Sequence, residues 1–256
     1  MTMQFDFTDK RVLITGSSRG IGFSAARAFL VAGAHVAING RTAASTAAAL
    51  TVLGNPEHTV AAPGDVATAT GCADIVQAAL AGLGRLDVLV NCAGVAKSGP
   101  SEAVTEADWD WLVDVNLKGT FFTSQAALPA LRASGGNIVN IASDAGLVGE
   151  RGLTVYCAAK GGVVNMTRAL ALELAPAVRV NCVCPGYVDT DMVRRDTIDK
   201  ASDPAALEET LKNKAPLQRI ASPEEIASAI LYLASAEARF VTGAAFQIDG
   251  GTTAGF

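Results

Sequence analysis

Two residues whose side chains can do acid–base chemistry lie four positions apart, at Tyr156 and Lys160. An apolar series of helical period follows them, which favours a helix. On a helix their Cβ atoms would share one face, about 5–6 Å apart. A charge about 4 Å away contributes about 4 kcal/mol at an effective dielectric near 20, and that lowers a tyrosine pKa by about 3 units. The pair would therefore make Tyr156 a proton donor at neutral pH, although an isolated pair of this kind is more often a surface tyrosine stacked on a lysine stem.

The composition indicates one globular α/β domain. The chain has 256 residues, of which 50% are hydrophobic and 18% are charged, which is enough for a large core. Its formal net charge of −5 argues against a nucleic-acid partner. The N-terminus lacks the apolar region of a signal peptide, and no apolar run reaches the roughly 18–20 residues of a membrane span. We therefore expect a cytoplasmic protein that binds neither nucleic acid nor membranes.

The cysteines do not indicate a disulfide framework or a metal site. Their number is odd and none forms a CxxC pair; they are Cys72, Cys92, Cys157, Cys182 and Cys184. Two thiols at positions 182 and 184 are too few for a zinc site. We predict small buried hydrophobic residues in a reducing compartment, and no metal.

A glycine-rich turn near the start of the chain is typical of a dinucleotide-binding unit. A short apolar strand over 11–15 leads into glycines at 16, 20 and 22, and a helical pattern runs on to position 33 before a second strand at 35–39. Glycines allow a tight turn and a close approach by phosphate, and the helix start offers unpaired N–H groups. The spacing G-x-x-x-G-x-G differs from the commoner G-x-G-x-x-G, and such a turn alone is weak support for a binding site.

Regular alternation of strands and helices predicts a parallel sheet covered on both faces. Further strands are expected at 58–62, 87–90, 136–141, 178–184 and 244–248, and further helices at 43–53, 68–83, 105–133, around Tyr156 and at 222–233. Residues 187–215 are rich in charge and are predicted to form a mobile lid over the substrate, with a short helix. With neither linker nor repeat, residues 1–256 are predicted to form a single dinucleotide-binding oxidoreductase domain.

The motifs form one ordered set along almost the whole chain: the glycine turn, Asn91-x-Ala93-Gly94, Asn116, Ser143, Tyr156-x-x-x-Lys160 and Pro185-Gly186. The set resembles the short-chain dehydrogenase/reductase family in its single-domain form. Each motif alone is weak, whereas the ordered set is highly specific; Cys92 stands where many members carry a second Asn. The resemblance implies a Rossmann-type doubly wound parallel sheet of about seven strands, and a homotetramer or homodimer.

The resemblance also implies catalytic roles in hydride transfer between a nicotinamide and a carbonyl or alcohol carbon. Tyr156 would be the general acid or base, and Lys160 would lower its pKa and hold the nicotinamide ribose. Ser143 would hydrogen-bond the reacting oxygen and polarise it. Asn116 would hold a water that links Lys160 to solvent. Without the resemblance, Ser143 would be a strand-end turn residue and Asn116 a helix-kink residue.

Binding residues are carried over from the family in the same way. Asp65 would accept a hydrogen bond from the adenine amino group, and Thr190 would bind near the carboxamide and phosphate. The full cofactor set is Gly16, Ser18, Arg19, Ile21, Arg41, Asp65, Val66, Asn91, Ala93, Gly94, Tyr156, Lys160, Pro185, Gly186, Val188 and Thr190. The substrate cleft is expected to be lined by Ser143, Asp144, Leu147, Leu153 and Tyr187.

The end of the second strand predicts the cofactor preference. An NAD enzyme normally places Asp or Glu there to bind the ribose 2′-hydroxyl, whereas this strand ends with Gly40 and Arg41 after Asn39. Arg41 and Arg19 would clamp a 2′-phosphate with charge-assisted hydrogen bonds. NADP(H) is therefore expected to be preferred, with NAD(H) possible; the alternative is that both are solvated surface arginines.

The predicted function is thus reduction or oxidation of a carbonyl or secondary alcohol in a small molecule such as a ketone, sugar or polyol. The nearest alternative is a 3-oxoacyl-[acyl-carrier-protein] reductase, which the chain also resembles. From another class, a non-catalytic dinucleotide-binding sensor would usually lack the Tyr or Lys, and both are present here. A nucleic-acid binder is disfavoured by the acidic charge.

Overall fold

Seven strands form one sheet in the order β3-β2-β1-β4-β5-β6-β7, and every neighbouring pair is parallel. The computed structural model describes residues 5–54 and 57–255, so expectations about residues 1–4 fall outside them. The strands are β1 (Arg11–Thr15), β2 (His35–Ile38), β3 (Thr59–Ala61), β4 (Val88–Asn91), β5 (Asn137–Ile141), β6 (Arg179–Pro185) and β7 (Ala245–Ile248). The predicted doubly wound parallel sheet of about seven strands is confirmed.

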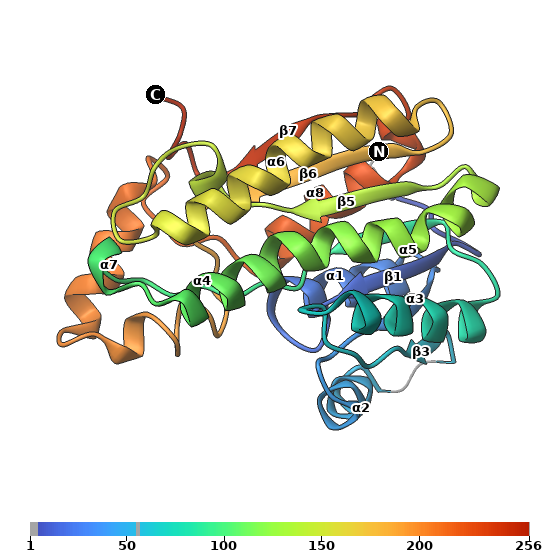
Figure 1. Cartoon of the computed structure of the whole chain (residues 1–256), viewed down its shortest axis with the longest axis horizontal. Coiled ribbons are helices and arrows are strands. Elements are labelled where there is room, and N and C mark those ends of the chain that lie inside the picture. The colour runs from blue at the N-terminus through green and yellow to red at the C-terminus, as the bar shows by residue number, and fades with distance from the viewer. Residues whose placement is uncertain (1–4, 55–56, 256) are drawn as a thin grey trace.

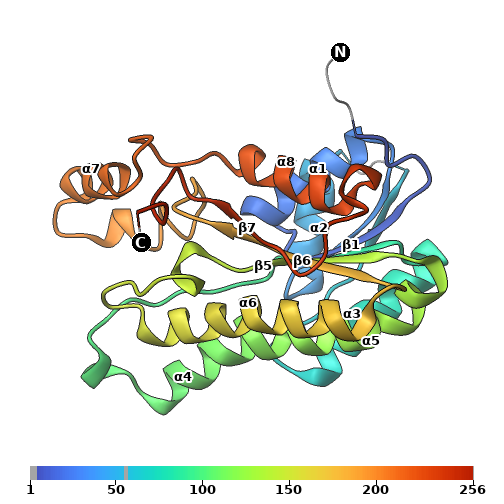
Figure 2. The same cartoon turned by 90° about the horizontal axis from the view of Figure 1, so that it is seen from above.

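Helices cover both faces of this sheet (Figures 1 and 2). One face packs against α1, α2 and α8, and the other against α3, α5 and α6. The helices are α1 (Gly20–Val31), α2 (Ala43–Val52), α3 (Ala69–Leu83), α4 (Glu106–Val113), α5 (Gly119–Ser134), α6 (Thr154–Leu174), α7 (Pro204–Lys214) and α8 (Pro223–Ala234). Within the described residues, no helix is both long and apolar enough to cross a membrane.

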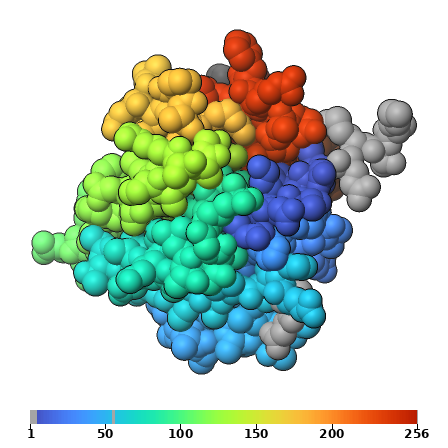
Figure 3. All heavy atoms as spheres, turned by 90° about the vertical axis from the view of Figure 1, so that its right-hand side faces the viewer, coloured from blue at the N-terminus to red at the C-terminus, as the bar shows by residue number. Residues whose placement is uncertain are grey.

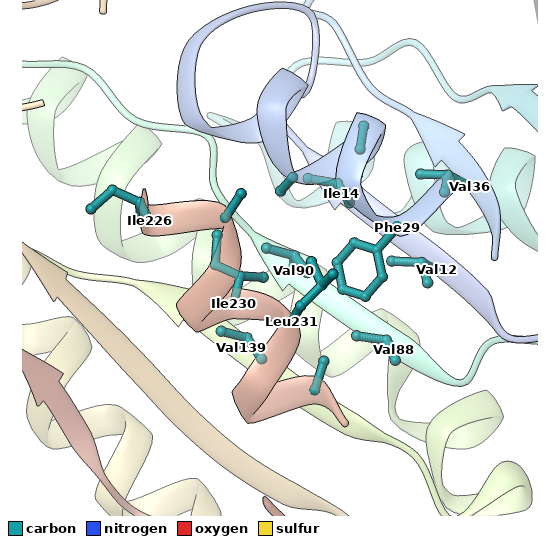
Figure 4. Close-up of a cluster of buried hydrophobic side chains, with 14 of the residues drawn as sticks. Val12, Ile14, Phe29, Val36, Val88, Val90, Val139, Ile226, Ile230 and Leu231 are labelled. Atoms are coloured by element: carbon teal, nitrogen blue, oxygen red, sulfur yellow. The ribbon is translucent and has the colours of Figure 1, made fainter. Parts of the chain in front are cut away.

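Successive strand residues enter opposite cores, which explains the nearly continuous apolar runs in the sequence. Val12 and Ile14 of β1 join the α1/α8 core, whereas Leu13 joins the α3/α5 core. Phe29 of α1 is fully buried, and Figure 4 shows its ring next to Val12 and Leu231 of the same core. These two cores hold the strand ends, and the loops that follow them, in fixed positions.

The predicted helical region at 105–133 is present, but it is not one regular helix. Thr105 and Asp108 form the expected capping box at the start of α4. A π-helical segment, Asp114–Lys118, then separates α4 from α5, and α5 continues through Pro129. Inserted π turns are often found at functional sites, and this one carries Asn116.

The carboxyl ends of the strands open toward one end of the molecule. The chain reverses its direction of sheet growth between β1 and β4, and such a switch point is where open α/β sheets bind ligands. Figures 1 and 2 show α7, from the charged segment 187–215, beyond this end. Figure 3 shows the opposite end of the molecule, where segments far apart in the sequence pack side by side. The short helix predicted within residues 187–215 is confirmed by α7. The mobility of that charged segment stays a prediction.

Candidate active site

Ser143 and Tyr156 are brought together by a close contact between two backbones. Ser143 follows β5 and opens a short turn, Asp144–Gly146, while Tyr156 lies in the first turn of α6. A Cβ on Gly146 would lie 2.8 Å from the backbone carbon of Lys160, so only glycine lets this turn pack against α6. The Ser143 hydroxyl lies near enough to the Tyr156 phenol to favour its ionised form and lower its pKa. Local sequence predicted both elements, and this packing juxtaposes them.

Burial dominates the electrostatics of Tyr156. It raises the pKa of the phenol to about 12, and nearby Asp144 raises the pKa further, while the hydrogen bond with Ser143 acts in the opposite direction. The ionised form loses hydration when it is buried, so the neutral phenol is favoured. The expected lowering of this pKa by Lys160 is therefore not found in the protein alone. At neutral pH, Tyr156 carries its proton and is set to donate it.

Lys160 is buried, and its ammonium group is held by the backbone rather than by the tyrosine. Its Nζ donates to the carbonyl oxygen of Ile141 over 2.8 Å and lies 5.7 Å from the centroid of the Tyr156 ring. Burial lowers the pKa of Lys160 to about 8. The two side chains share one face of α6, as the spacing predicts, but the distance leaves room for a ligand hydroxyl near the ammonium.

Asn116 of the π segment closes the inner wall of the same space. Its Nδ2 donates to the carbonyl oxygens of Val95 and Leu112, and its Oδ1 accepts from the Val95 N–H. A Cβ on Gly94 would lie 3.0 Å from Asn116 Oδ1 and 3.6 Å from Lys160 Nζ. Gly94 therefore faces both residues, as expected for a backbone lining the cofactor, while the water relay through Asn116 stays a prediction.

The glycine turn is clamped by polar side chains that the motif analysis did not include. Gly16 has φ of +64°, and a Cβ there would lie 2.6 Å from the Cα of Ala93. Thr15 Oγ1 accepts from the N–H groups of Cys92 and Ala93, and Asn39 Oδ1 accepts from the Gly16 N–H. The sequence signal for these contacts was the presence of polar residues, Thr15 and Asn39, at the carboxyl ends of β1 and β2, and both are buried.

The start of α1 has free capacity for an anion. Its N-cap, Arg19, makes no side-chain cap, whereas Thr42, Thr68, Thr105, Asp203 and Ser222 cap the starts of α2, α3, α4, α7 and α8. Thr190 lies over the turn, because a Cβ on Gly20 would be 3.3 Å from its Cγ2. Unpaired N–H groups beneath such a cover suit a pyrophosphate. The residues present therefore fit a dinucleotide.

The end of β2 differs in detail from the predicted phosphate clamp. Arg41 is exposed and makes no ion pair among the described residues, whereas Arg19 forms an exposed ion pair with Asp191 over 3.3 Å. Exposed pairs contribute about 0–1 kcal/mol, so a phosphate can displace Asp191. A Cβ on Gly40 would lie 2.5 Å from Ser45 Oγ, which leaves no space for a side chain there.

Two of the cofactor residues carried over from the family make local contacts with their side chains. Asp65 Oδ1 accepts from the Ala67 N–H. Asn91 is buried, and its Nδ2 donates to Ser124 and Asn140 beneath the sheet. The Asn91 side chain thus joins β4 to β5 and α5, so any contact with the cofactor would come from its backbone. Val66 and Val188 are buried, Pro185 ends β6, and Gly186 lies against Asp249.

The substrate side holds a charged cluster that the sequence analysis only partly named. Lys214, at the end of α7, donates to Glu150 Oε1 over 2.6 Å and to the Tyr187 hydroxyl over 3.3 Å. It thereby joins the charged segment to the loop after β5. Leu147 packs near Cys182 and Cys184, and Leu153 precedes α6. Glu150 and Lys214 had no family motif to mark them, and only the fold pairs them.

The arrangement can move a proton at one oxygen beside a dinucleotide groove. A half-buried phenol and a buried serine lie together, and a buried ammonium stands next to the backbone of Gly94. In the described part of the chain, no group of three or more His, Cys, Asp or Glu could hold a metal ion. These groups suit acid–base chemistry at a carbonyl or hydroxyl.

Comparisons with known proteins agree with this geometry. A family model described as enoyl-(acyl carrier protein) reductase matches residues 16–253. The chain is 41% identical to 2-(S)-hydroxypropyl-CoM dehydrogenase 3 of Xanthobacter autotrophicus, covering 95% of this chain and 96% of the relative. It is 37% identical to a 3-oxoacyl-[acyl-carrier-protein] reductase of Chlamydia muridarum, covering 95% and 97%.

Solved structures show the same fold. The crystal structure of a short-chain dehydrogenase/reductase, glucose/ribitol dehydrogenase, from Brucella melitensis aligns with a TM-score of 0.90 at 35% identity. The alignment covers 98% of this chain and 99% of that one. The similarity therefore extends across the sheet, the loops at its carboxyl edge and the charged segment beyond it.

Proposed function

Because this chain belongs to the short-chain dehydrogenase/reductase family, whose members oxidise alcohols or reduce ketones with a nicotinamide dinucleotide, we propose that it is an NADP(H)-dependent oxidoreductase of a small ketone, sugar or polyol. The observation that carries the proposal is the meeting of Ser143, Tyr156 and Lys160 beside Gly94. The oligomeric state that we propose is a homotetramer or homodimer. Light scattering after size-exclusion chromatography tests it.

Each catalytic residue has one task in the proposed mechanism. The bound cofactor supplies or accepts the hydride. Tyr156 donates its proton to the carbonyl oxygen in reduction and takes it back in oxidation. Ser143 orients the reacting oxygen. Lys160 presents a buried ammonium toward the ribose hydroxyls and the proton path, and Asn116 fixes the Val95 backbone that lines this space.

An activity screen tests the proposal directly. Oxidation of NADPH and NADH would be followed with ketones, aldoses, keto sugars and acyl thioesters, and the reverse reaction with polyols and secondary alcohols. We expect turnover with at least one small carbonyl compound and none with the Tyr156→Phe variant. Tight NADPH binding without turnover of any compound would instead support the dinucleotide sensor.

We expect NADP(H) to be preferred over NAD(H). Arg41 is exposed and makes no ion pair with the residues that the structure describes, and Gly40 offers no carboxylate and no space for one. Arg41→Asp should reverse the preference, because it removes a cation and adds an acceptor for the 2′-hydroxyl. The measurement is kcat/KM for each cofactor with one substrate.

The control for this prediction is Arg132→Asp, which makes the same charge change at an exposed site in the last turn of α5. It should leave the cofactor ratio unchanged. Gly40→Asp should lose affinity for both cofactors, because its Cβ would meet Ser45 and Thr46. A wild-type preference for NAD(H) would refute the proposed cofactor.

We also expect a free small molecule to be a better substrate than a carrier-bound acyl group. Carrier proteins are acidic, so their reductases need free basic groups near the cleft. Arg194 is bound by Asp189 over 2.7 Å and by Glu208 over 2.9 Å. Arg195 lies 3.6 Å from both Asp191 and Asp196. Both arginines of the charged segment, Arg194 and Arg195, thus lie beside carboxylates of the same segment.

Another basic residue, Arg168, lies farther from the chemistry. Arg168 is twelve residues beyond Tyr156 on α6, which places it about 18 Å along the helix. The test compares acetoacetyl thioester, free and on carrier protein, with small ketones. A strong advantage of the carrier-bound form that disappears at high salt would favour the reductase function of the Chlamydia relative.

A further inference from the structure

The hydroxyl of Ser143 is committed to the next residue in the chain. Ser143 Oγ donates to Asp144 Oδ1 over 2.9 Å and accepts from the Ala145 N–H over 3.2 Å. The Tyr156 phenol lies near this hydroxyl, which lowers the pKa of the phenol. A serine hydroxyl has one hydrogen and two lone pairs. With its hydrogen on Asp144 and one lone pair on the Ala145 N–H, Ser143 has no donor left and keeps one lone pair free.

A carbonyl oxygen and an alcohol place opposite demands on this serine. A ketone oxygen only accepts hydrogen bonds, whereas an alcohol also donates one. While Asp144 is a carboxylate, Ser143 can accept from an alcohol but has no hydrogen for a ketone. A protonated Asp144 becomes a donor. It can then donate to Ser143 Oγ, and the serine hydrogen becomes available to a carbonyl oxygen.

The surroundings of Asp144 make this proton equilibrium accessible. Burial raises the pKa of Asp144, and the charges of Asp249 and Glu150 raise it further, while hydrogen bonds from Ser143 and Ala145 act in the opposite direction. The titratable groups around it come from four further places in the fold: Cys184 of β6, Tyr187 after β6, Tyr156 of α6, and Lys214 of α7, which pairs with Glu150.

We propose that Asp144 is a positioning residue whose protonation decides whether Ser143 donates to the substrate oxygen or accepts from it. Protein with protonated Asp144 then prefers the carbonyl compound, and protein with ionised Asp144 prefers the alcohol. No covalent bond to substrate changes in this step: one proton from solvent binds the carboxylate, and the serine hydrogen turns. The proposal rests on the proposed oxidoreductase function.

The first experiment needs no substrate. An infrared pH titration of the ligand-free protein should contain a protonated-carboxyl band that Asp144→Asn removes. Its midpoint should lie above the ordinary value for aspartate. Ser143→Ala should keep the band but move its midpoint upward, because the ionised carboxylate loses a donor. Absence of an Asp144 band above that ordinary value overturns the proposal whatever the enzyme reduces.

The second experiment uses the ketone that turns over fastest in the screen, and its alcohol. In the wild type, KM for the ketone should rise about three- to tenfold as pH passes upward through the infrared midpoint, the range for one neutral hydrogen bond. The inhibition constant of the alcohol should fall over the same interval. In Asp144→Asn and in Ser143→Ala, both constants should lose this dependence.

Glu150→Gln is the matched control, because it removes another carboxylate of the same cleft. The Glu150→Gln variant should lower the infrared midpoint of Asp144 but keep the pH dependence of KM and of the inhibition constant. Equal pH dependence in the wild type and Asp144→Asn would overturn the role of Asp144. Lack of turnover in both proteins would instead refute the proposed function, so the two failures are distinguishable.

Discussion

Tyr156→Phe is expected to reduce turnover by about 10²–10⁴-fold, the ordinary contribution of a positioned acid or base. The substitution removes only the hydroxyl that carries the proton, and keeps the ring that packs in α6. Binding of NADPH, measured by fluorescence titration, should stay close to wild type. Alcohol oxidation by the wild type should rise with pH, because a pKa of about 12 leaves little tyrosinate at neutral pH.

The control for this variant is Tyr232→Phe, which removes a phenol from α8 on the other core. Its turnover should match the wild type. Near wild-type turnover in Tyr156→Phe would exclude this residue as the acid and with it the proposed mechanism. A matching loss of cofactor binding would indicate damage to the fold, which the thermal unfolding of the two variants would reveal.

Lys160→Met should lose activity and cofactor affinity, yet change stability in a pH-dependent way. Methionine fills similar space without a charge, and the loss of rate should be about 10²-fold or more, as for other groups that stabilise developing charge. The ammonium is buried, and the pKa of Lys160 is lowered from 10.5 to about 8. A shift of that size corresponds to about 3 kcal/mol of differential stability.

The sign of this effect follows from proton binding. Between pH 8 and 10.5 the unfolded chain keeps the proton on Lys160, whereas the folded protein has lost it. Stability therefore rises with pH over this interval, and it is lowest below pH 8. Between pH 8 and 10.5, the free energy of unfolding of the wild type should rise by about 3 kcal/mol relative to that of Lys160→Met. Denaturant unfolding measures this difference.

Lys10→Met replaces an exposed lysine, and its stability should stay parallel to the wild type with pH. If Lys160→Met also stays parallel, the ammonium is solvated and the inferred burial is wrong. The activity loss would then need another cause. The two measurements together separate the catalytic role of Lys160 from the stability that its burial costs.

Local patterns determined the elements of this protein. Val12–Ile14 reads as an apolar strand because both faces of a parallel sheet are buried, and Ser222 with Pro223 and Glu225 predicts a helix start because these residues satisfy N–H groups within one turn. The glycines of the turn and the Tyr156–Lys160 spacing are local in the same sense. The sequence therefore predicted the fold class and the position of each motif.

Tertiary packing decided how those motifs act. Lys160 was expected to lower the pKa of Tyr156, but it bonds the Ile141 carbonyl, and burial raises that pKa instead. Desolvation depends on everything that surrounds a group, so spacing along one helix cannot supply it. The same holds for Asn39 under the glycine turn, for Asp191 beside Arg19, and for the π segment around Asn116. Their partners come from distant strands and loops, and only the folded chain brings them within hydrogen-bond distance.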